Sequence, residues 1–296
     1  MKIGIDLGGT KIEIRAFDQQ NVEVFKKRVK TPSSNYFEII KSIQELVEVC
    51  AKEIGVEFTV GIGIPGTISP ATGLVKNANT TCLIGKPFDK DLEQAIKKPI
   101  RIANDANCFA LSEAVDGAAK DGDIVFGVIL GTGVGGGLVI GKKAIVGCNS
   151  ISGEWGHNPL PWSDSGPVRQ CYCGKKNCIE SYLSGPALEK SYFELAGKEI
   201  EASVLADLAE SGDVVCLRVL KNYELMLAKA LAHMINIVDP DVVVLGGGLS
   251  NLTSLYKNVP SLIEGWAFSD SLQTKLLKAK YGDSSGVRGA AWLWDS

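Results

Sequence analysis

The chain has 296 residues, of which 45% are hydrophobic and 22% are charged, and its formal net charge is −3. This length leaves room for two hydrophobic cores, and the composition excludes a disordered or fibrous chain. The small negative charge gives no electrostatic reason to expect nucleic acid or an acidic membrane surface as a partner. No positively charged, then apolar, leader precedes the first apolar run, so we expect a cytoplasmic protein in which disulfides are rare.

Strand-like and helix-like runs alternate along the chain. We expect strands at 2–9, 12–18, 22–31, 58–68 and 99–105, and helices at 34–54, 88–97 and 106–118. After a polar connector at 118–123, the run Ile124–Gly141 is long and uncharged, but its middle is GTGVGGG. Two buried strands joined by a glycine turn explain it better than a membrane-spanning helix.

The rest of the chain repeats this pattern of strand followed by glycine turn. An irregular stretch at 148–185 is rich in Gly, Pro and Cys, and residues 200–236 are mostly helical in pattern. Residues 241–250 predict a buried strand, a glycine turn and the start of a helix, and an apolar helix closes the chain within 278–294. The alternation indicates an α/β fold with two related halves.

Three predicted strands end in glycine turns: DLGGTK (6–11), GTGVGG (131–136) and LGGGLS (245–250). Such turns let backbone N–H groups approach an anion. One glycine turn alone is commonly just a tight hairpin, but three together favour nucleotide binding. None of them fits a P-loop or a Rossmann site. In the first turn Asp6 is a candidate magnesium ligand through water, with Thr10 and Lys11 as further polar groups, and Thr132 stands at the tip of the second.

A candidate catalytic carboxylate follows the predicted strand at 99–105. Asn104 and Asp105 lie at the end of this strand and the start of a helix, where ligands gather in α/β folds. A helix N-terminus favours an ionised carboxylate, which can accept a proton from a hydroxyl group that attacks a γ-phosphate. Taken alone, the residues favour the simpler alternative that Asp105 is only a helix N-cap.

CYCGKKNC, at 171–178, gathers three of the eight cysteines. Tetrahedral zinc needs four ligands, and Cys171, Cys173 and Cys178 supply three of them. Of the two histidines, His233 lies in an apolar helical run and His157 lies in a loop, so His157 is the fourth ligand by elimination. A site with four protein ligands has no open position and is structural. Reduced thiols without a metal are the alternative, and a redox pair is less favoured because C-x-C is not C-x-x-C.

Two carboxylates flank the predicted zinc ligands. Glu154 lies three residues before His157, and Glu180 lies two residues after Cys178. A zinc site would hold both carboxylates in place, which suits hydrogen bonding to the hydroxyl groups of a sugar. Alone, each glutamate is more often a solvated surface residue.

The order of these motifs identifies a resemblance. IGIDLGGTK, GIGIPG, NDANC, LGTGVGGG, GEWGH, CYCGKKNCIE and VVVLGGG follow one another as in the ROK family, which comprises bacterial sugar kinases and related repressors. The resemblance covers essentially the whole chain, from Lys2 to the closing GDSSGVRGAAWLW. It implies a two-domain actin-like ATPase (ribonuclease H-like) α/β fold with an active-site cleft between the domains. The implied small domain is 1–118 with 283–296, and the large domain, with the zinc loop, is 119–282.

The resemblance also implies roles for individual residues. Asp105 is similar to the catalytic base of the family. The implied sugar contacts are Gly66, Asn79, Asn104, Asp105, Glu154, His157 and Glu180. The implied ATP-binding residues are Asp6, Gly9, Thr10, Lys11, Thr132, Gly133, Gly247 and Gly248. The implied zinc ligands are His157, Cys171, Cys173 and Cys178. Asn177 departs from the family pattern, which has glycine there, but Asn tolerates the left-handed conformation and we expect the turn to survive.

The implied function is an ATP- and magnesium-dependent hexose kinase with a structural zinc ion. VKNANTT, GKPFDKDL and GEWGHNPLPW are most similar to fructokinases that also act on mannose, so we expect phosphorylation of the 6-hydroxyl of fructose. N-acetylglucosamine kinase and glucokinase activities are the alternatives within the family. A hexose and ATP are the expected partners, and a homodimer is expected because similar proteins are often dimers.

Two other classes of protein are less favoured. A sugar-responsive repressor would carry a helix-turn-helix region, whereas this chain starts at the first glycine-turn strand and has no basic patch. A catalytically inactive sugar-binding protein would not need Asp6, Lys11 and Asp105 together.

Overall fold

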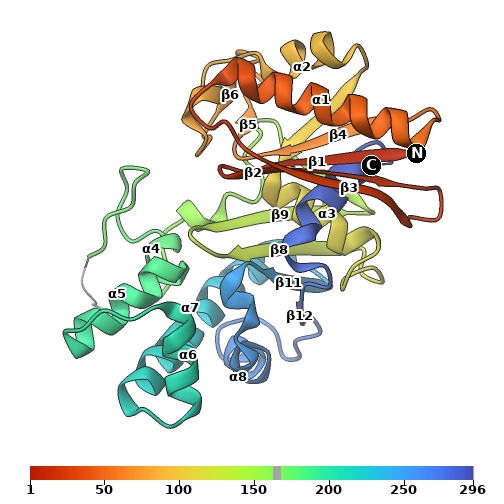
Figure 1. Ribbon diagram of the computed structural model, residues 1–296. Helices are drawn as coiled ribbons and strands as arrows, with labels where there is room; N and C mark the ends of the chain where they lie inside the picture. Colours follow the sequence, from red (N-terminus) through yellow and green to blue (C-terminus); the bar gives the residue numbers. More distant parts are fainter. Residues whose placement is uncertain (163–167, 296) are drawn as a thin grey trace. The chain divides into compact units, whose positions relative to one another are not determined.

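The computed structural model describes residues 1–162 and 168–295, shown in Figure 1. The chain forms two compact units. Unit 1 comprises Met1–Lys120, Gly137–Gly153 and Asp283–Ser296, and unit 2 comprises Asp121–Gly136 and Glu154–Gly282. The division drawn from the sequence placed residues 137–153 in the second domain, whereas the units place them in the first. The mixed α/β fold class is confirmed.

Unit 1 contains a five-stranded sheet in the order β3-β2-β1-β4-β7. Its strands are β1 (Lys2–Leu7), β2 (Lys11–Phe17), β3 (Glu23–Lys30), β4 (Thr59–Ile64) and β7 (Ile100–Asn104). Short turns make β1, β2 and β3 antiparallel neighbours, whereas β1, β4 and β7 run parallel. Parallel pairing needs a long crossover. The crossovers contain the helices α1 (Tyr36–Ile54) and α2 (Phe88–Ile96), the small sheet of β5 (Thr67–Ile68) and β6 (Val75–Lys76), and the short η1 (Thr81–Leu83).

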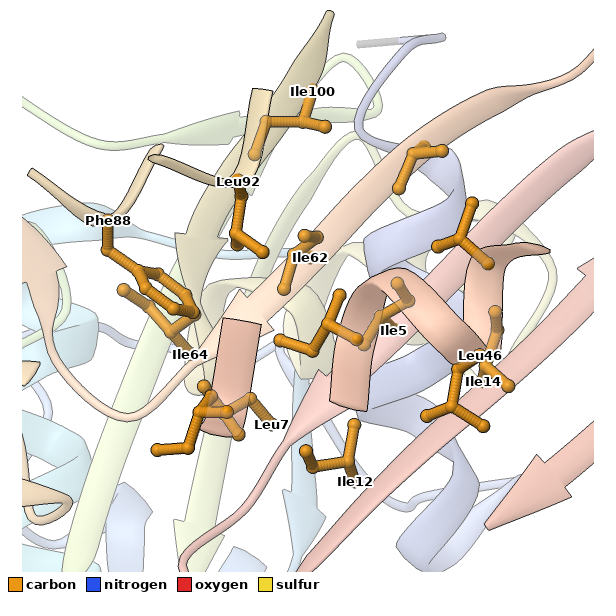
Figure 2. Close-up of a cluster of buried hydrophobic side chains, with 14 of the residues drawn as sticks. Ile5, Leu7, Ile12, Ile14, Leu46, Ile62, Ile64, Phe88, Leu92 and Ile100 are labelled. Carbon is orange, nitrogen blue, oxygen red and sulfur yellow. The ribbon is translucent and has the colours of Figure 1, made fainter. Parts of the chain in front are cut away.

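Helix α1 shows how the sequence sets these elements. Asn35 caps its start by accepting hydrogen bonds from the backbone N–H groups of Phe37 and Glu38, and Gly55 ends it in the left-handed conformation. Apolar residues of α1 at helical spacing face the sheet. Figure 2 shows the core that results, in which side chains of β1, β2, β4, β7, α1 and α2 meet. Its labelled members are Ile5, Leu7, Ile12, Ile14, Leu46, Ile62, Ile64, Phe88, Leu92 and Ile100.

The last helix of the chain, α9 (Ser285–Trp292), packs into unit 1 against the sheet and against α3 (Asp105–Val115). A Cβ atom added to Gly4 of β1 or to Gly61 of β4 would lie 1.9 Å from a carbonyl oxygen of α9. A Cβ atom on Gly289 of α9 would lie 1.6 Å from the carbonyl oxygen of Cys108 in α3. Backbone therefore touches backbone on both sides of α9, which only glycine allows.

Replacing Gly289 with alanine is expected to lower the free energy of unfolding by about 3 kcal/mol or more. The added methyl group would overlap with backbone atoms, which cannot relieve the clash by adopting another rotamer. Reversible urea denaturation, followed by circular dichroism, measures this change. Gly265→Ala is the matched control, because Gly265 is exposed, has an ordinary φ of −71°, and would place a Cβ atom no closer than 3.6 Å to its neighbours. Equal stability of the two variants would contradict the close packing of α9.

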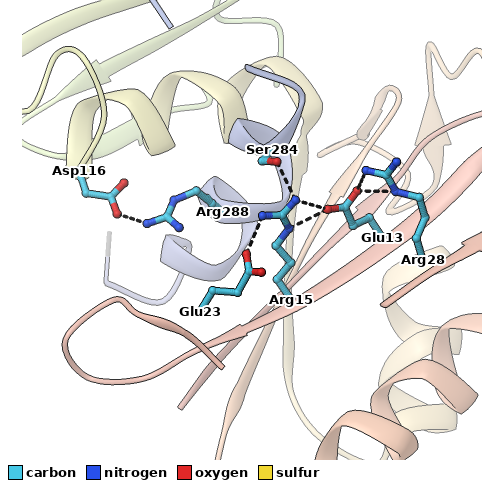
Figure 3. A network of polar contacts seen from close by, with 7 residues as sticks. All are labelled: Glu13, Arg15, Glu23, Arg28, Asp116, Ser284 and Arg288. Carbon is cyan, nitrogen blue, oxygen red and sulfur yellow. Dashed lines mark hydrogen bonds and ion pairs between the residues drawn. The ribbon is translucent and has the colours of Figure 1, made fainter. Parts of the chain in front are cut away.

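A hydrogen bond and an ion pair also attach the C-terminal segment to the rest of unit 1 (Figure 3). Arg15 on β2 donates to Ser284 at 2.6 Å and to the carboxylate of Glu13 at 2.7 Å. Burial would raise the pKa of Glu13, but hydrogen bonds from Arg28 and Arg15 outweigh it and hold this pKa below its ordinary value. The glutamate therefore stays ionised and paired, which a buried charge requires. In the same view Arg288 of α9 pairs with Asp116.

The second sheet has the order β10-β9-β8-β11-β12. Its strands are β8 (Ile124–Leu130), β9 (Val134–Ile140), β10 (Lys143–Ile145), β11 (Val242–Gly246) and β12 (Lys275–Lys278), and the division between the units passes within β9. The glycine-rich run at 124–141 thus forms two neighbouring strands, as predicted. Strands β8, β11 and β12 run parallel.

Helices and short 3-10 turns complete unit 2. The helices are α4 (Glu180–Leu183), α5 (Gly185–Ala196), α6 (Ala202–Glu210), α7 (Val214–Val238) and α8 (Thr253–Glu264). The 3-10 turns are η2 (Trp155–His157) and η3 (Gly248–Asn251), and η4 (Gly282–Ser284) leads back into unit 1. Among the residues that the structure describes, no helix combines the length and the apolar character needed to cross a membrane.

Candidate functional site

In unit 1 the candidate residues gather at the carboxyl ends of three parallel strands. The register pairs Asp6 of β1 with Gly63 of β4, and Ile64 of β4 with Asn104 of β7. The turn after β1, the turn after β4 and the start of α3 therefore lie at one edge of the sheet. Ligand sites of open α/β sheets form at this edge.

Asp6 is held in an unusual electrostatic environment. Burial, followed by the negative charges of Asp105 and Glu13, raises the pKa of Asp6 to about 7, although Lys11 and Arg28 oppose the shift. A bound cation would reverse this effect, because positive charge favours the ionised carboxylate. The carboxylate oxygens of Asp6 thus fit the hard-cation chemistry of magnesium.

Asn104 and Asp105 have different structural roles at the start of α3. The N-cap is Asn104, not Asp105: its side-chain oxygen accepts the N–H of Ala106 at 2.9 Å, and its amide group donates to the carbonyl oxygen of Gly66 at 3.1 Å. Asp105 is the first residue of the helix and also accepts the N–H of Ala106, at 2.8 Å. The helix start is therefore capped without Asp105, which weakens the explanation of Asp105 as a cap alone.

The other candidate residues of unit 1 surround this edge. Gly66 has a φ of 100°, and a Cβ atom there would lie 2.6 Å from the carbonyl oxygen of Lys76, so only glycine fits the turn that leads toward exposed Asn79. In the turn after β1, the N–H of Gly8 donates to the carbonyl oxygen of Lys11 at 2.9 Å. This tight turn leaves Gly9 and Thr10, the central residues, exposed to solvent.

In unit 2 the two remaining glycine turns follow the parallel strands β8 and β11. The N–H of Gly131 donates to the carbonyl oxygen of Gly133 at 3.0 Å, which leaves Thr132 exposed at the tip. Gly247 has a φ of 80°, and a Cβ atom on it would lie 2.4 Å from the carbonyl oxygen of Leu130. Gly247 therefore lies against the backbone at the end of β8, the strand that leads into the turn with Thr132 and Gly133.

The third glycine turn differs from its prediction. Gly248 opens the short turn η3, and the helix α8 starts only at Thr253. The N–H of Ser250 bonds to the carbonyl oxygen of Gly247 within this turn. The expected helix N-terminus beside the turn is thus replaced by one turn of 3-10 geometry.

Glu180 connects the glycine turns to the cysteine loop. Its carboxylate accepts the backbone N–H of Val134 at 2.9 Å. A Cβ atom on Gly133 would lie 2.6 Å from the same carboxylate, so a larger residue there would displace the Glu180 side chain. A residue implied as a sugar contact and a turn implied as an ATP contact are therefore neighbours in unit 2.

His157, Cys171, Cys173 and Cys178 converge, and their ligand atoms all lie within 4.8 Å of one another. With zinc–sulfur distances of about 2.3 Å and a zinc–nitrogen distance of about 2.0 Å, a tetrahedral site separates two sulfurs by about 3.8 Å and sulfur from nitrogen by about 3.5 Å. The Sγ atoms of Cys173 and Cys178 are 3.7 Å apart, and Cys171 Sγ is 3.6 Å from His157 Nδ1. These distances exclude a disulfide and fit a Cys3His zinc site.

The backbone of the cysteine loop is set by its own polar contacts. Asn177 adopts a φ of 56°, so the expectation that asparagine would preserve the turn is confirmed. Its side-chain oxygen also accepts the N–H of Arg169 and the hydroxyl of Tyr182, each at 2.9 Å. Asparagine therefore does more than glycine would, because it ties the loop to the start of α4.

Tyr172, between two of the cysteines, is the contact that the sequence did not indicate. Its hydroxyl lies 3.0 Å from His157 Nε2, and the two rings meet edge to face with centroids 5.2 Å apart. Burial of the hydroxyl, then the charges of Glu180, Cys171 and Glu154, raises the pKa of Tyr172 to about 12. The spacing C-x-C leaves its middle residue unspecified, so only the folded loop shows that the hydroxyl of Tyr172 lies against His157.

Comparison with known proteins gives matches over the full length of the chain. The ROK family model matches residues 2–296. The N-acetyl-D-glucosamine kinase of Vibrio parahaemolyticus is 41% identical over 299 residues, which cover 99% of each chain.

Solved structures agree with this match. The ROK hexokinase of Thermus thermophilus superposes with a TM-score of 0.88 at 30% identity, covering 99% of this chain and 97% of the other. A ROK glucokinase from Streptomyces griseus, solved with glucose and AMPPNP, gives a TM-score of 0.77 at 26% identity, covering 99% and 98%.

Proposed function

The chain belongs to the ROK family, and from this premise we propose that it transfers the γ-phosphate of ATP to the 6-hydroxyl of N-acetyl-D-glucosamine. The observation that carries the proposal is the 41% identity, over 99% of both chains, to an N-acetyl-D-glucosamine kinase. ATP-dependent phosphorylation of a sugar is common to the relatives described above. The N-acetylated substrate is the finer part of the proposal.

In the proposed reaction Asp105 is the general base. Its carboxylate accepts the proton of the 6-hydroxyl while the sugar oxygen bonds to the γ-phosphorus, and the bond from that phosphorus to ADP breaks. Asn104 supports the start of α3 so that Asp105 keeps its position. Magnesium, when bound with ATP, would neutralise phosphate charge, and Asp6 is the residue that we assign to it, with Gly9, Thr10 and Lys11 beside it.

The remaining assignments are divided between the two units. Glu154, His157 and Glu180 of unit 2 are proposed as sugar contacts, together with Gly66 and Asn79 of unit 1. The turns with Thr132, Gly133, Gly247 and Gly248 are proposed to bind ATP through their N–H groups. The four-residue Cys and His cluster would hold zinc as a structural element.

Fructose, the substrate expected from the motifs at 75–92 and 153–162, lacks support among these relatives. An N-acetyl-D-glucosamine kinase is more similar to this chain than the hexokinase and glucokinase structures are. The shared motifs specify the family frame, whereas substrate choice depends on side chains around C1 and C2 of the sugar. N-acetylglucosamine phosphorylation, which the sequence suggested as an alternative, is therefore the activity that we propose.

An ADP-release assay across a panel of sugars tests the proposal. We expect kcat/KM for N-acetyl-D-glucosamine to exceed the values for glucose, mannose and fructose by about 100-fold, because a site that hydrogen-bonds a substrate group rejects analogues without it. A higher kcat/KM for fructose or glucose would replace the proposed substrate. No turnover with any sugar would reject the kinase function itself.

A further inference from the structure

We propose that Thr31 is a positioning residue for ATP, because it fixes the glycine turn after β1 in the orientation that presents the N–H of Gly9 to a phosphate group. The inference rests on the proposed function and deepens it, since it names the side chain that shapes a phosphate contact of the same site. Thr31 lies directly after β3, and none of the sequence motifs includes it. Thr31 and the turn both belong to unit 1.

Thr31 makes two hydrogen bonds to this turn. Its hydroxyl donates to the carbonyl oxygen of Gly8 at 2.7 Å, and its backbone N–H donates to the carbonyl oxygen of Thr10 at 3.0 Å. Only 3% of the surface of Thr31 is exposed, so water competes little for either bond. The carbonyl groups of Gly8 and Thr10 therefore both point toward one buried residue.

These bonds set the direction of the N–H of Gly9. In a trans peptide the C=O of one residue and the N–H of the next point in opposite directions. Since the carbonyl group of Gly8 faces Thr31, the N–H of Gly9 faces away from it, and Gly9 is exposed to solvent. Within residues 1–162 and 168–295, this N–H has no hydrogen-bond partner. It is thus a donor available to an anion in the turn that we assign to phosphate binding.

The turn needs this support because its own residues do not fix its shape. Glycine allows both signs of φ, so the peptide between Gly8 and Gly9 rotates more easily than one between larger residues. A rotated peptide would present the carbonyl oxygen of Gly8, with its partial negative charge, to the phosphate group. Thr31 is itself well held, because Pro32 restricts the residue before it to extended backbone conformations.

The test compares Thr31→Val with Thr31→Ser in the full-length protein. Valine keeps the shape of the side chain but removes the hydroxyl. We expect the KM for ATP to rise by about 5- to 50-fold, because a buried carbonyl group loses its partner and the turn loses its fixed orientation. The KM for N-acetyl-D-glucosamine should change by less than about twofold. Serine keeps the hydroxyl, so Thr31→Ser should keep the KM for ATP within about twofold of the unmodified value.

Calorimetry with AMPPNP measures the same loss as a dissociation constant, without turnover. Thr274→Val is the matched control, because Thr274 lies in unit 2 and its hydroxyl donates to the carbonyl oxygen of Pro240, also at 2.7 Å. Both valine variants lose one hydrogen bond from threonine to a carbonyl group, so their melting temperatures should fall by similar amounts. Only Thr31→Val should bind AMPPNP more weakly.

Three results would overturn the inference. These are an unchanged affinity for AMPPNP in Thr31→Val, equal losses of affinity in Thr31→Val and Thr31→Ser, and equal losses in Thr31→Val and Thr274→Val. Failure of the proposed function is seen separately, because it is measured on the unmodified protein as absent turnover of N-acetyl-D-glucosamine or absent binding of AMPPNP.

Discussion

Replacing Asp105 with asparagine is expected to lower kcat by about 10³-fold, while the KM values for sugar and ATP change by no more than a few-fold. A positioned general base contributes about 10²- to 10⁴-fold to such a reaction. The substitution is nearly isosteric, and its amide oxygen still accepts the N–H of Ala106, which Asn104 also caps. The start of α3 therefore survives, and the change isolates the carboxylate charge. Steady-state kinetics with coupled detection of ADP measures the effect.

The control for this variant is Asp121→Asn, which removes a carboxylate from an exposed position. Its kcat should equal that of the unmodified protein. Both variants should keep the same melting temperature, which shows that loss of activity does not come from unfolding. A kcat for Asp105→Asn within about tenfold of the unmodified value would remove Asp105 from the proposed mechanism.

Replacing Cys178 with serine is expected to abolish zinc binding and to lower the free energy of unfolding by more than about 3 kcal/mol, a part of the roughly 10 kcal/mol with which zinc stabilises zinc-finger peptides. Cys178 is buried, and its Sγ lies 3.7 Å from that of Cys173. Without zinc, η2 and the start of α4 lose their common anchor. The KM for sugar should then rise by about 10- to 100-fold, because Glu154 and Glu180 are no longer held in place.

Atomic emission measures the zinc content, and thermal denaturation measures the stability. Cys148→Ser is the matched control, since Cys148 is exposed and lies outside the cluster. Full zinc content and unchanged KM in Cys178→Ser would contradict a zinc site that orients the sugar contacts. Equal losses in both serine variants would point to a general sensitivity to cysteine replacement.

The parts of the fold with strong periodic patterns could be predicted from the sequence. Helix α1 has an amphipathic pattern, a capping asparagine and a terminal glycine, and the central strands are long apolar runs that end at glycines. Strand β12 has only four residues, none of them buried, and so lacks the apolar pattern that would have indicated it. The bounds of α8 were missed because a 3-10 turn separates it from the glycines after β11.

The site was predicted where chemistry depends on residue type and missed where it depends on neighbours from other segments. Three cysteines and one loop histidine limit the possible zinc ligands strongly, and these four residues do converge. The contact of Tyr172 with His157 joins residues that lie 15 positions apart in the chain, and no spacing rule contains it. The sequence likewise did not show that Asn104, and not Asp105, is the N-cap of α3.

The placement of α9 has a consequence for how the protein is made. Residues 121–296 leave the ribosome after most of unit 1, and at about 5–20 residues per second their synthesis takes roughly 10–35 s. Throughout this interval the groove between the sheet and α3 lacks the helix that fills it. Unit 1, the unit that is synthesised first, can therefore complete its packing only after the last residues of the chain have left the ribosome. A premature stop codon that removes only the last helix would therefore destabilise unit 1, although this unit contains the start of the chain.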